Sequence, residues 1–256
     1  MSKTLNNVCA LVLAAGKGKR MGADKPKVLQ ILAEKPLLGH VFHTLHDAGV
    51  DEVYVVVGHR QEEVTSHFGD VSVTWVVQED QRGTGHAVRC AREFLQDYAG
   101  DMLVVNGDAP FITPETITSM VKQHRDADAT ATLLTCHLED PHGHGRILRN
   151  GAPYGRPARI IEERDATDEQ RAIREVNGGL YCFRADRIFK FLDRLGNDNV
   201  KHEYYLTEVV EILNREGMIV EAYRCTNPKE LSNINTPEEL EKAQELLDDL
   251  EDWTDG

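Results

Sequence analysis

Long apolar runs, a signal peptide and paired cysteines are all missing from this sequence. No apolar stretch in its 256 residues approaches the roughly 20 residues that cross a bilayer, and residues 1–7 lack the apolar core of a signal peptide. The five cysteines show no Cys-x-x-Cys spacing, which disfavours a zinc site or a disulfide framework. We therefore predict a cytoplasmic protein with reduced thiols and no membrane partner.

Positive charge is also scarce. The chain has 29 Lys and Arg residues against 43 Asp and Glu, a net charge of −14, which argues against a surface that binds nucleic acid or an anionic membrane. The exception is a group of five basic residues that we call the basic island: Lys17, Lys19, Arg20, Lys25 and Lys27. Cations gathered at one place in an acidic chain suit a small polyanion better than a polymer.

Two common phosphate-binding motifs are missing as well. No Gly-x-x-x-x-Gly-Lys-[Ser/Thr] string is present, so the chain has no Walker A loop. A dinucleotide fingerprint needs Gly-x-Gly-x-x-Gly, but Gly22 comes one residue too late. The strand that ends at Val57 is not followed by the acidic residue that would hold a ribose. These differences disfavour an NAD-type oxidoreductase.

Strand-like and helix-like segments alternate along the first half of the chain. Continuous apolar runs predict buried strands, and apolar residues at helical spacing predict helices. The predicted strands are Val8–Ala14, Val53–Val57, Val73–Val77 and Met102–Val105, and the predicted helices are Pro36–Ala48, Ala87–Leu95 and Pro114–His124. Strands that alternate with crossover helices indicate an α/β fold with a Rossmann-like, doubly wound and mostly parallel sheet.

The second half of the chain is less regular and richer in strands. Two capping boxes, which begin at Thr167 and Thr236, each predict the start of a helix. The predicted strands are Ala129–Cys136, Gly145–Arg149, Ala158–Glu163, Leu180–Phe183 and Ile219–Tyr223. Because no repeat, linker or sharp boundary interrupts the chain, we predict a single domain over residues 1–256.

A glycine-rich loop follows the first predicted strand. Ligands of open α/β sheets bind at the carboxyl ends of strands, which is where the segment Leu13–Met21 lies. Glycines allow backbone N–H groups to approach phosphate oxygens and to form an anion-binding concavity. The planar guanidinium of Arg20 can grip phosphate oxygens, and Lys27 adds a compact charge. The basic island therefore predicts a phosphate site at this loop.

Polar groups follow two further predicted strands. After Val77, the amide of Gln78 can donate and accept at once, which fits the edge of a pyrimidine. The amide alone does not choose uracil over cytosine, because flipping it exchanges donor and acceptor; backbone groups near Gly83 must settle that choice. After Val105, the carboxylate of Asp108 would project into the same crevice as the glycine-rich loop. Oxygen ligands of this kind suit Mg²⁺.

The string from Leu13 to Met21, together with Pro26-Lys27-Val28-Leu29, resembles the signature of the sugar-phosphate nucleotidyltransferases. Within that family the chain is most similar to the N-terminal uridylyltransferase domain of the bifunctional N-acetylglucosamine-1-phosphate uridyltransferases. The resemblance extends over roughly Val8 to Leu240. The bifunctional proteins continue into hexapeptide repeats that form an acetyltransferase domain, and no such repeats occur in this sequence.

The resemblance implies a nucleotidyltransferase type A fold and a reaction between UTP and N-acetylglucosamine 1-phosphate that yields UDP-N-acetylglucosamine and pyrophosphate. It divides the domain into a nucleotide-binding half (about 8–128), a smaller β-rich sugar-phosphate-binding half (about 129–235) and a C-terminal helix (236–252). The implied catalytic residues are Arg20 and Lys27. The implied nucleotide-binding residues are Leu13, Ala14, Ala15, Gly16, Gly18, Lys27, Gln78, Gly83 and Thr84. The implied sugar-binding residues are Gly145, Glu162 and Asn177. The implied Mg²⁺ ligands are Asp108 and Asn235.

Several positions depart from the usual pattern of this family. Three of them lie on the sugar side: His144 replaces a tyrosine, Gly178 replaces a threonine or serine, and Asn233 replaces a glycine. Transfer to a different sugar 1-phosphate, transfer of a different nucleotide, and a non-catalytic sensor of nucleotides or sugars therefore remain alternative hypotheses. The sequence leaves the oligomeric state open.

Overall fold

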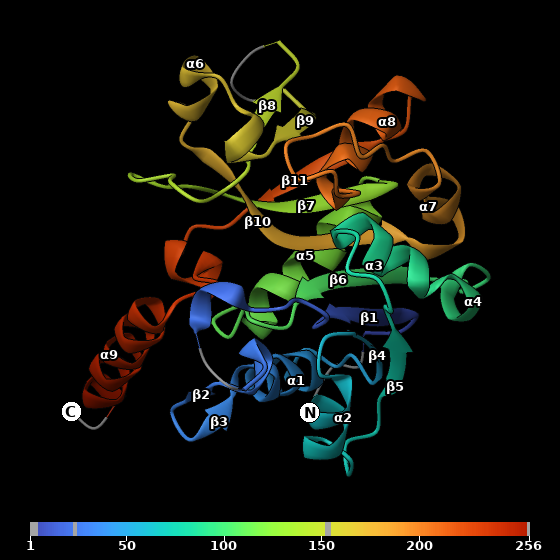
Figure 1. Ribbon diagram of the computed structural model, residues 1–256. Helices are drawn as coiled ribbons and strands as arrows, with labels where there is room; N and C mark the ends of the chain where they lie inside the picture. Colours follow the sequence, from blue (N-terminus) through green and yellow to red (C-terminus); the bar gives the residue numbers. More distant parts are fainter. Residues whose placement is uncertain (1–4, 23–24, 152–154, 255–256) are drawn as a thin grey trace.

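A mostly parallel sheet runs through the whole molecule (Figure 1). The computed structural model describes residues 5–22, 25–151 and 155–254, without the side chains of Lys19 and of residues 246–254. The strand order is β11-β7-β10-β6-β1-β4-β5, and in this path only β10 runs antiparallel to its neighbours. These strands are β1 (Val8–Leu13), β4 (Glu52–Val57), β5 (Thr74–Val77), β6 (Asp101–Asn106), β7 (Ala131–His137), β10 (Glu175–Arg184) and β11 (Val220–Arg224). The predicted doubly wound, mostly parallel sheet is confirmed.

Helices cover both faces of the sheet, which explains why its central strands are continuous apolar runs. Successive side chains of a strand point to opposite faces, so Ala10 and Val12 of β1 join one buried cluster while Cys9 and Leu11 join the other. The first face is covered by α1 (Leu37–Asp47), α2 (Gln61–His67) and α5 (Pro114–Asp126). The second face is covered by α3 (Thr84–Cys90), α4 (Arg92–Leu95), α7 (Ala185–Leu192) and α8 (Val209–Arg215).

A smaller β-rich part is built onto β10. Strands β8 (Arg146–Arg149) and β9 (Pro157–Ile161) pair antiparallel, and β8 also pairs with β10. The capping box predicted at Thr167 is confirmed: its hydroxyl accepts from the Gln170 N–H and the Gln170 side chain accepts from the Thr167 N–H. The remaining short elements are η1 (Lys19–Met21), η2 (Lys27–Leu29), β2 (Ile31–Leu32), β3 (Lys35–Pro36), η3 (Glu163–Asp165), α6 (Asp168–Arg171), η4 (Leu206–Glu208) and η5 (Pro228–Leu231).

The final helix, α9 (Pro237–Thr254), stands at one side of the molecule beside the β2–β3 hairpin (Figure 1). The predicted capping box at Thr236 forms only in part. The Thr236 hydroxyl accepts from the Glu239 N–H at 3.2 Å, but the Glu239 carboxylate accepts from the N–H of Asn235, one residue earlier than a capping box requires, at 2.6 Å. The helix is tied to the hairpin by the Ala33 N–H, which donates to Gln244 Oε1 at 2.8 Å.

Several elements differ from the sequence-based prediction. The single helix predicted over Ala87–Leu95 is two helices, because the chain leaves helical geometry at Ala91. Strand β10 is longer than the predicted Leu180–Phe183, and its pairing with β7 is irregular between Asn177 and Tyr181. Helices α2, α7 and α8 were not predicted. Each spans only seven or eight residues, which is too short for a helical repeat of apolar residues to stand out.

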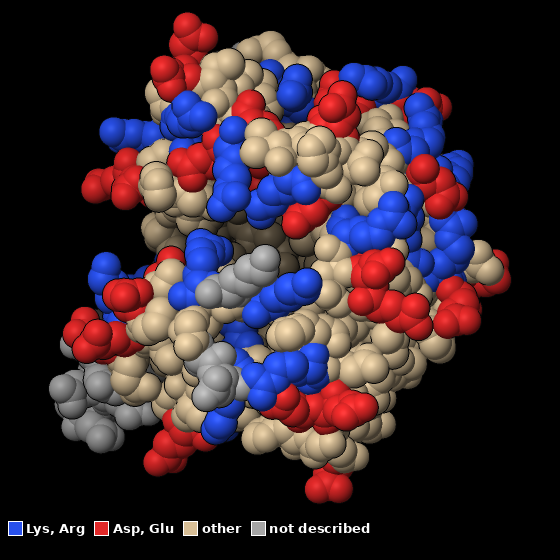
Figure 2. All heavy atoms as spheres, viewed as in Figure 1, with Lys and Arg blue, Asp and Glu red and all other residues tan. Residues whose placement is uncertain are grey.

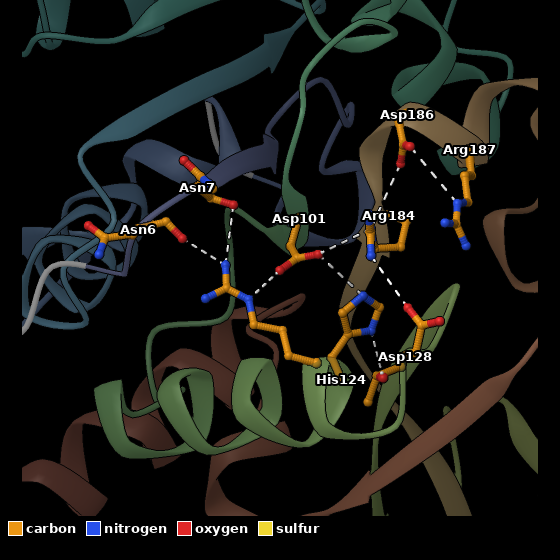
Figure 3. A network of polar contacts seen from close by, with 10 residues as sticks. Asn6, Asn7, Asp101, His124, Asp128, Arg184, Asp186 and Arg187 are labelled. Atoms are coloured by element: carbon orange, nitrogen blue, oxygen red, sulfur yellow. Dashed lines mark hydrogen bonds and ion pairs between the residues drawn. The ribbon is translucent and has the colours of Figure 1, made fainter.

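Opposite the carboxyl edge of the sheet, the amino end of β6 carries a buried polar network (Figure 3). Asp101 is 4% exposed and its carboxylate lies 2.6 Å from Arg125 Nε, 3.5 Å from His124 Nε2 and 3.7 Å from Arg184 Nε. The other ring nitrogen of His124 lies 2.9 Å from the Thr132 hydroxyl. The network therefore joins β6, α5, β10 and β7 at the edge of the sheet away from the glycine-rich loop.

No helix in the described ranges is long and apolar enough to span a membrane. All five cysteines lie within those ranges and are unpaired, and Cys90 is the one that is only half-buried.

Candidate active site

A cleft of about 780 Å³ opens where the carboxyl ends of β1 and β6 meet. From β1 the chain continues to β4 and β5 on one side of the sheet and then returns to β6 on the other. Such a switch point leaves a crevice outside the strand ends, where open α/β sheets bind ligands. Figure 2 shows this hollow on one face of the molecule, with Lys and Arg side chains gathered around its rim.

The glycine-rich loop forms one wall of the cleft and is shaped by two left-handed glycines. Gly18 and Gly22 have φ values of +57° and +59°, a region that favours glycine. A Cβ atom on Gly18 would lie 2.9 Å from Lys27 Cβ, so a side chain there would push the loop away from Lys27. Arg20 and Lys27 both line the cleft.

The cleft gathers every residue predicted for catalysis, nucleotide binding and metal binding. Its described lining includes Leu13, Ala14, Ala15, Gly16, Gly18, Arg20, Lys27, Gln78, Gly83, Thr84, Asp108 and Asn235. It also includes Glu203 and four polar residues that had no predicted role: Gln81, Asn106, Arg164 and Lys201. Arg164 lies in η3 and Lys201 in a loop, both far from the basic island in sequence, so no local pattern could have indicated them.

Lys27, Asp108 and Asn235 meet inside the cleft. The Lys27 ammonium donates to the Asp108 carboxylate and lies 3.1 Å from Asn235 Oδ1. Asn235 Nδ2 donates to the Asn233 carbonyl at 3.2 Å, which turns the amide oxygen toward Lys27. The Ile234 N–H donates to the Asp108 carbonyl at 3.1 Å and ties the two segments together. A carboxylate oxygen and an amide oxygen thus converge on one cation, and this donor set fits Mg²⁺.

The geometry around Gln78 resolves the orientation of its amide. The side chain is 3% exposed, and Nε2 donates to the Gly83 carbonyl at 3.1 Å and lies 2.9 Å from His86 Nδ1. Because a carbonyl oxygen only accepts, the atom beside it must be the amide nitrogen. The Gly83 carbonyl therefore fixes which end of the Gln78 amide faces it.

The segment from Glu203 to Thr207 packs directly on the Gly83 loop. The Tyr204 N–H donates to the Arg82 carbonyl and the Gly85 N–H donates to the Tyr204 carbonyl, both at 2.8 Å. The Leu206 N–H donates to the Thr84 hydroxyl at 3.0 Å, so this predicted nucleotide-binding side chain is engaged in the fold. A Cβ atom on Gly83, whose φ is +110°, would lie 2.5 Å from the Tyr204 carbonyl oxygen. Only glycine fits this contact without displacing backbone.

The three predicted sugar-binding residues lie side by side where neighbouring strands meet: Gly145 directly precedes β8, Glu162 directly follows β9, and Asn177 lies in β10. Arg146 pairs with Ile161 of β9 and with Val176 of β10, which places the residues one step further along, Gly145, Glu162 and Asn177, next to one another. Asn177 N–H donates to the Gly145 carbonyl at 2.9 Å.

The sugar-side residues are outside the described lining of the 780 Å³ cleft but adjoin it. Asn106 lines the cleft, and its side-chain nitrogen lies 2.8 Å from the position of a Cβ atom on Gly179, two residues after Asn177. Burial raises the pKa of Glu162, although a hydrogen bond from the Thr207 hydroxyl and the charge of Lys201 oppose this rise. The Thr207 hydroxyl donates to Glu162 Oε1 at 2.9 Å.

Comparison with known proteins identifies the family. The family model described as "MobA-like NTP transferase domain" matches residues 10–181. The chain belongs to this family. The match begins in β1 and ends in β10, so it includes the glycine-rich loop, the Gln78–Thr84 segment and Asp108.

Relatives of this NTP transferase chain include curated bacterial proteins. "Bifunctional protein GlmU" of Geotalea uraniireducens (strain Rf4) is 40% identical over 95% of the chain, and that of Clostridium botulinum (strain 657 / Type Ba4) is 40% identical over 93%. These matches cover 53% and 52% of the two proteins, so the chain spans about half the length of the curated relatives it matches.

A solved structure of UDP-glucose pyrophosphorylase complexed with UDP-glucose superposes with a TM-score of 0.75. The superposition covers 93% of this chain and 97% of that one at 16% sequence identity. This likeness supports the fold alone. Family membership and fold together establish a nucleotidyltransferase, and the expected resemblance to the nucleotidyltransferases is confirmed.

Proposed function

We propose that this nucleotidyltransferase transfers a uridylyl group from UTP to N-acetylglucosamine 1-phosphate, giving UDP-N-acetylglucosamine and pyrophosphate. The observation that carries the proposal is the meeting of Lys27, Asp108 and Asn235 beside the glycine-rich loop. These residues are separated by 81 and 208 positions in the chain, measured from Lys27. A cation, a carboxylate and an amide in one cleft suit a triphosphate and a divalent ion better than a neutral ligand.

The proposed reaction is a single in-line displacement. A phosphate oxygen of the sugar 1-phosphate attacks the α-phosphorus of UTP, a new P–O bond forms, and the bond to the β-phosphate oxygen breaks, so that pyrophosphate leaves with the bonding electron pair. No protein nucleophile is required, because positioning and charge stabilisation supply most of the acceleration in phosphoryl-type transfers. The backbone of the loop from Ala14 to Gly18 would hold the triphosphate.

The two catalytic cations stabilise the charge that develops on the leaving pyrophosphate. An ammonium group has three N–H donors, and Lys27 uses two of them on Asp108 and Asn235. One donor remains for a phosphate oxygen without breaking either contact. Arg20 lines the same cleft, and its planar guanidinium can bind two phosphate oxygens at once.

Asp108 and Asn235 would hold the Mg²⁺ ion. When bound, the ion would neutralise phosphate charge in the way common to such enzymes. Asp108 is positioned by the turn that follows β6, and Asn235 by its Nδ2 contact and by the start of α9. Two further cleft cations, Arg164 and Lys201, come from the side of the cleft that carries Glu162 and are placed to attract the acceptor phosphate.

A substrate panel tests this proposal. Pyrophosphate release is measured with each of UTP, CTP, GTP and TTP, each with N-acetylglucosamine 1-phosphate and with glucose 1-phosphate. The expected best pair is UTP with N-acetylglucosamine 1-phosphate. Equal or better use of glucose 1-phosphate overturns the sugar assignment, and preference for another nucleotide overturns the uridylyl assignment. Binding of nucleotide without release of pyrophosphate from any pair would instead favour a non-catalytic sensor.

A further inference from the structure

The amide of Gln78 is held by two acceptors at once. Its Nε2 donates to the Gly83 carbonyl at 3.1 Å and lies 2.9 Å from His86 Nδ1. A primary amide nitrogen has two hydrogens, so these two contacts use both of them. Within the described part of the chain, all hydrogen bonds of this side chain go through Nε2. The group that Gln78 offers to the cleft is therefore its carbonyl oxygen.

His86 can hold the amide in this way only if its Nδ1 carries no proton. The residue lies in the first turn of α3, half-buried below the Gly83 loop. Burial lowers the pKa of His86, and the charges of Arg89 and Arg82 lower it further, while Asp80 opposes them. A neutral imidazole with its proton on Nε2 accepts a hydrogen bond at Nδ1.

The two arginines are fixed beside His86 by Tyr204. The guanidinium carbons of Arg89 and Arg82 lie 4.3 Å and 5.1 Å from the centre of the Tyr204 ring, and Arg82 also donates to the Tyr204 hydroxyl at 3.2 Å. Tyr204 is in turn bound through its backbone to Arg82 and Gly85. The fold thus keeps two cations near the imidazole of His86, and their charge disfavours a second proton on that ring.

We propose that His86 is a specificity-determining residue, which fixes the Gln78 amide so that its oxygen faces the base and the cleft accepts uracil rather than cytosine. The inference rests on the proposed function, because it requires a pyrimidine at Gln78. Uracil carries an N–H at N3, which donates to the Gln78 oxygen. Cytosine carries a bare nitrogen at N3, so two acceptors would face each other in a buried place.

Flipping the amide does not rescue cytosine. A flipped Gln78 would place its oxygen against the Gly83 carbonyl, which has no proton to donate, and against His86 Nδ1, which has none in the tautomer protonated on Nε2. Unpaired buried polar groups give the strongest discrimination between similar ligands, about 10⁴- to 10⁵-fold. His86 never contacts the nucleotide in this scheme; it acts through Gln78 as a positioning residue.

The test compares kcat/KM for UTP and CTP in the wild-type chain and in three variants. His86→Leu removes the acceptor, and its UTP-to-CTP ratio is expected to fall by at least about tenfold. His86→Asn places an amide oxygen near the position of Nδ1 and is expected to keep the ratio within about threefold of wild type. Cys90→Ala is the matched control, because its sulfur lies 4.0 Å from the same Nδ1. This variant should leave the ratio unchanged.

A variant that only disturbs the structure of α3 lowers the rate with both nucleotides and leaves the UTP-to-CTP ratio unchanged. A change in this ratio therefore indicates that His86 positions Gln78. The dUTP-to-dTTP ratio is an internal control, because uracil and thymine present the same N3–H, and it should be unchanged in every variant. Dissociation constants for UTP and CTP, measured by calorimetry, repeat the test without turnover. If the His86→Leu variant does not fold, His86→Ala takes its place.

Each outcome has one meaning. A wild-type enzyme that prefers UTP, with an unchanged ratio in His86→Leu, overturns the role of His86 and leaves the proposed function intact. A wild-type enzyme that prefers CTP or a purine nucleotide overturns both. Loss of discrimination in His86→Leu together with its retention in His86→Asn supports the proposal.

Discussion

Strand β6 carries a buried aspartate near each end, and the two aspartates have opposite surroundings. Asp101, at the amino end, is 4% exposed, and Asp108, just after the carboxyl end, is 6% exposed. Asp101 is surrounded by His124, Arg125 and Arg184. Among the described residues, Asp108 forms an ion pair with one cation, Lys27. The two carboxylates are therefore similarly buried, but Asp101 is paired with more cations than Asp108.

The difference lies in what the surrounding charges can still bind. At Asp101, further carboxylates of Asp128 and Asp186 lie 3.6 Å and 3.8 Å from Arg184, so the cations of the network are themselves paired (Figure 3). Around Asp108 the cleft also holds Arg20, Arg164 and Lys201. The first network is closed on itself and stabilises the fold. The second has cations left over, which suits a polyanionic ligand.

The largest expected effect belongs to Asp108. Replacing Asp108 with alanine should reduce kcat by at least ~10²-fold, because a proposed metal ligand and the partner of Lys27 are lost together. Pyrophosphate release measures the rate, and far-UV circular dichroism establishes that the variant is folded. Asp70→Ala, which removes an exposed carboxylate outside the cleft, is the matched control. Normal turnover of the Asp108 variant would remove this residue from the mechanism.

Replacing Asp101 should instead lower the stability of the fold and leave kcat unchanged. Asp101→Asn leaves His124, which is 1% exposed, and two arginines without their central carboxylate. Breaking a buried pair costs up to about 3–5 kcal/mol, and because Arg125 is 41% exposed we expect about 2–3 kcal/mol. Urea unfolding at pH 7 measures the loss. The kcat of the folded variant should equal that of wild type, and a fall in kcat at unchanged stability would contradict the comparison.

The pH dependence of stability tests whether Asp101 is paired as a charged carboxylate in the folded protein. Burial alone would raise the pKa of Asp101, but its contacts with His124 and Arg125 outweigh burial and hold the pKa below its usual range. A carboxyl whose pKa is depressed in the folded state stabilises above the unfolded value, about 3.9, and that contribution is lost as the pH falls further. The difference in unfolding free energy between wild type and Asp101→Asn should therefore shrink below about pH 4. Urea midpoints at pH 7, 4 and 3 measure it, and a constant difference would show that Asp101 does not titrate in this way.

The smallest effect is expected at an exposed ion pair of α5. Lys122 and Asp126 contact each other one helical turn apart with side chains 76% and 63% exposed. Lys122→Ala should change the unfolding free energy by less than about 0.5 kcal/mol and leave kcat unchanged. Thermal and urea unfolding provide the measurement. If Lys122→Ala lowered the unfolding free energy as much as Asp101→Asn, burial would not explain the contribution of the Asp101 network to stability.

Local features of the chain predicted the architecture well. The apolar runs of β1 and β6, the proline at the start of α5 and the capping box at Thr167 each depend on neighbours within a few residues. Short elements with few buried residues, such as α2 with its single buried Val64, carried too little periodicity to be predicted. The antiparallel direction of β10 was also not predicted, because pairing direction depends on where the chain returns to the sheet.

The sequence by itself determined that a basic, glycine-rich loop follows a buried strand and that an acidic residue follows another. Only the tertiary structure decided that Lys27 meets both Asp108 and Asn235, and that Arg164 and Lys201 face the same cleft. It also decided which end of the Gln78 amide faces that cleft. The physical reason is the same in each case. Contacts between distant residues depend on the order and register of strands in the sheet, and no short stretch of sequence contains that information.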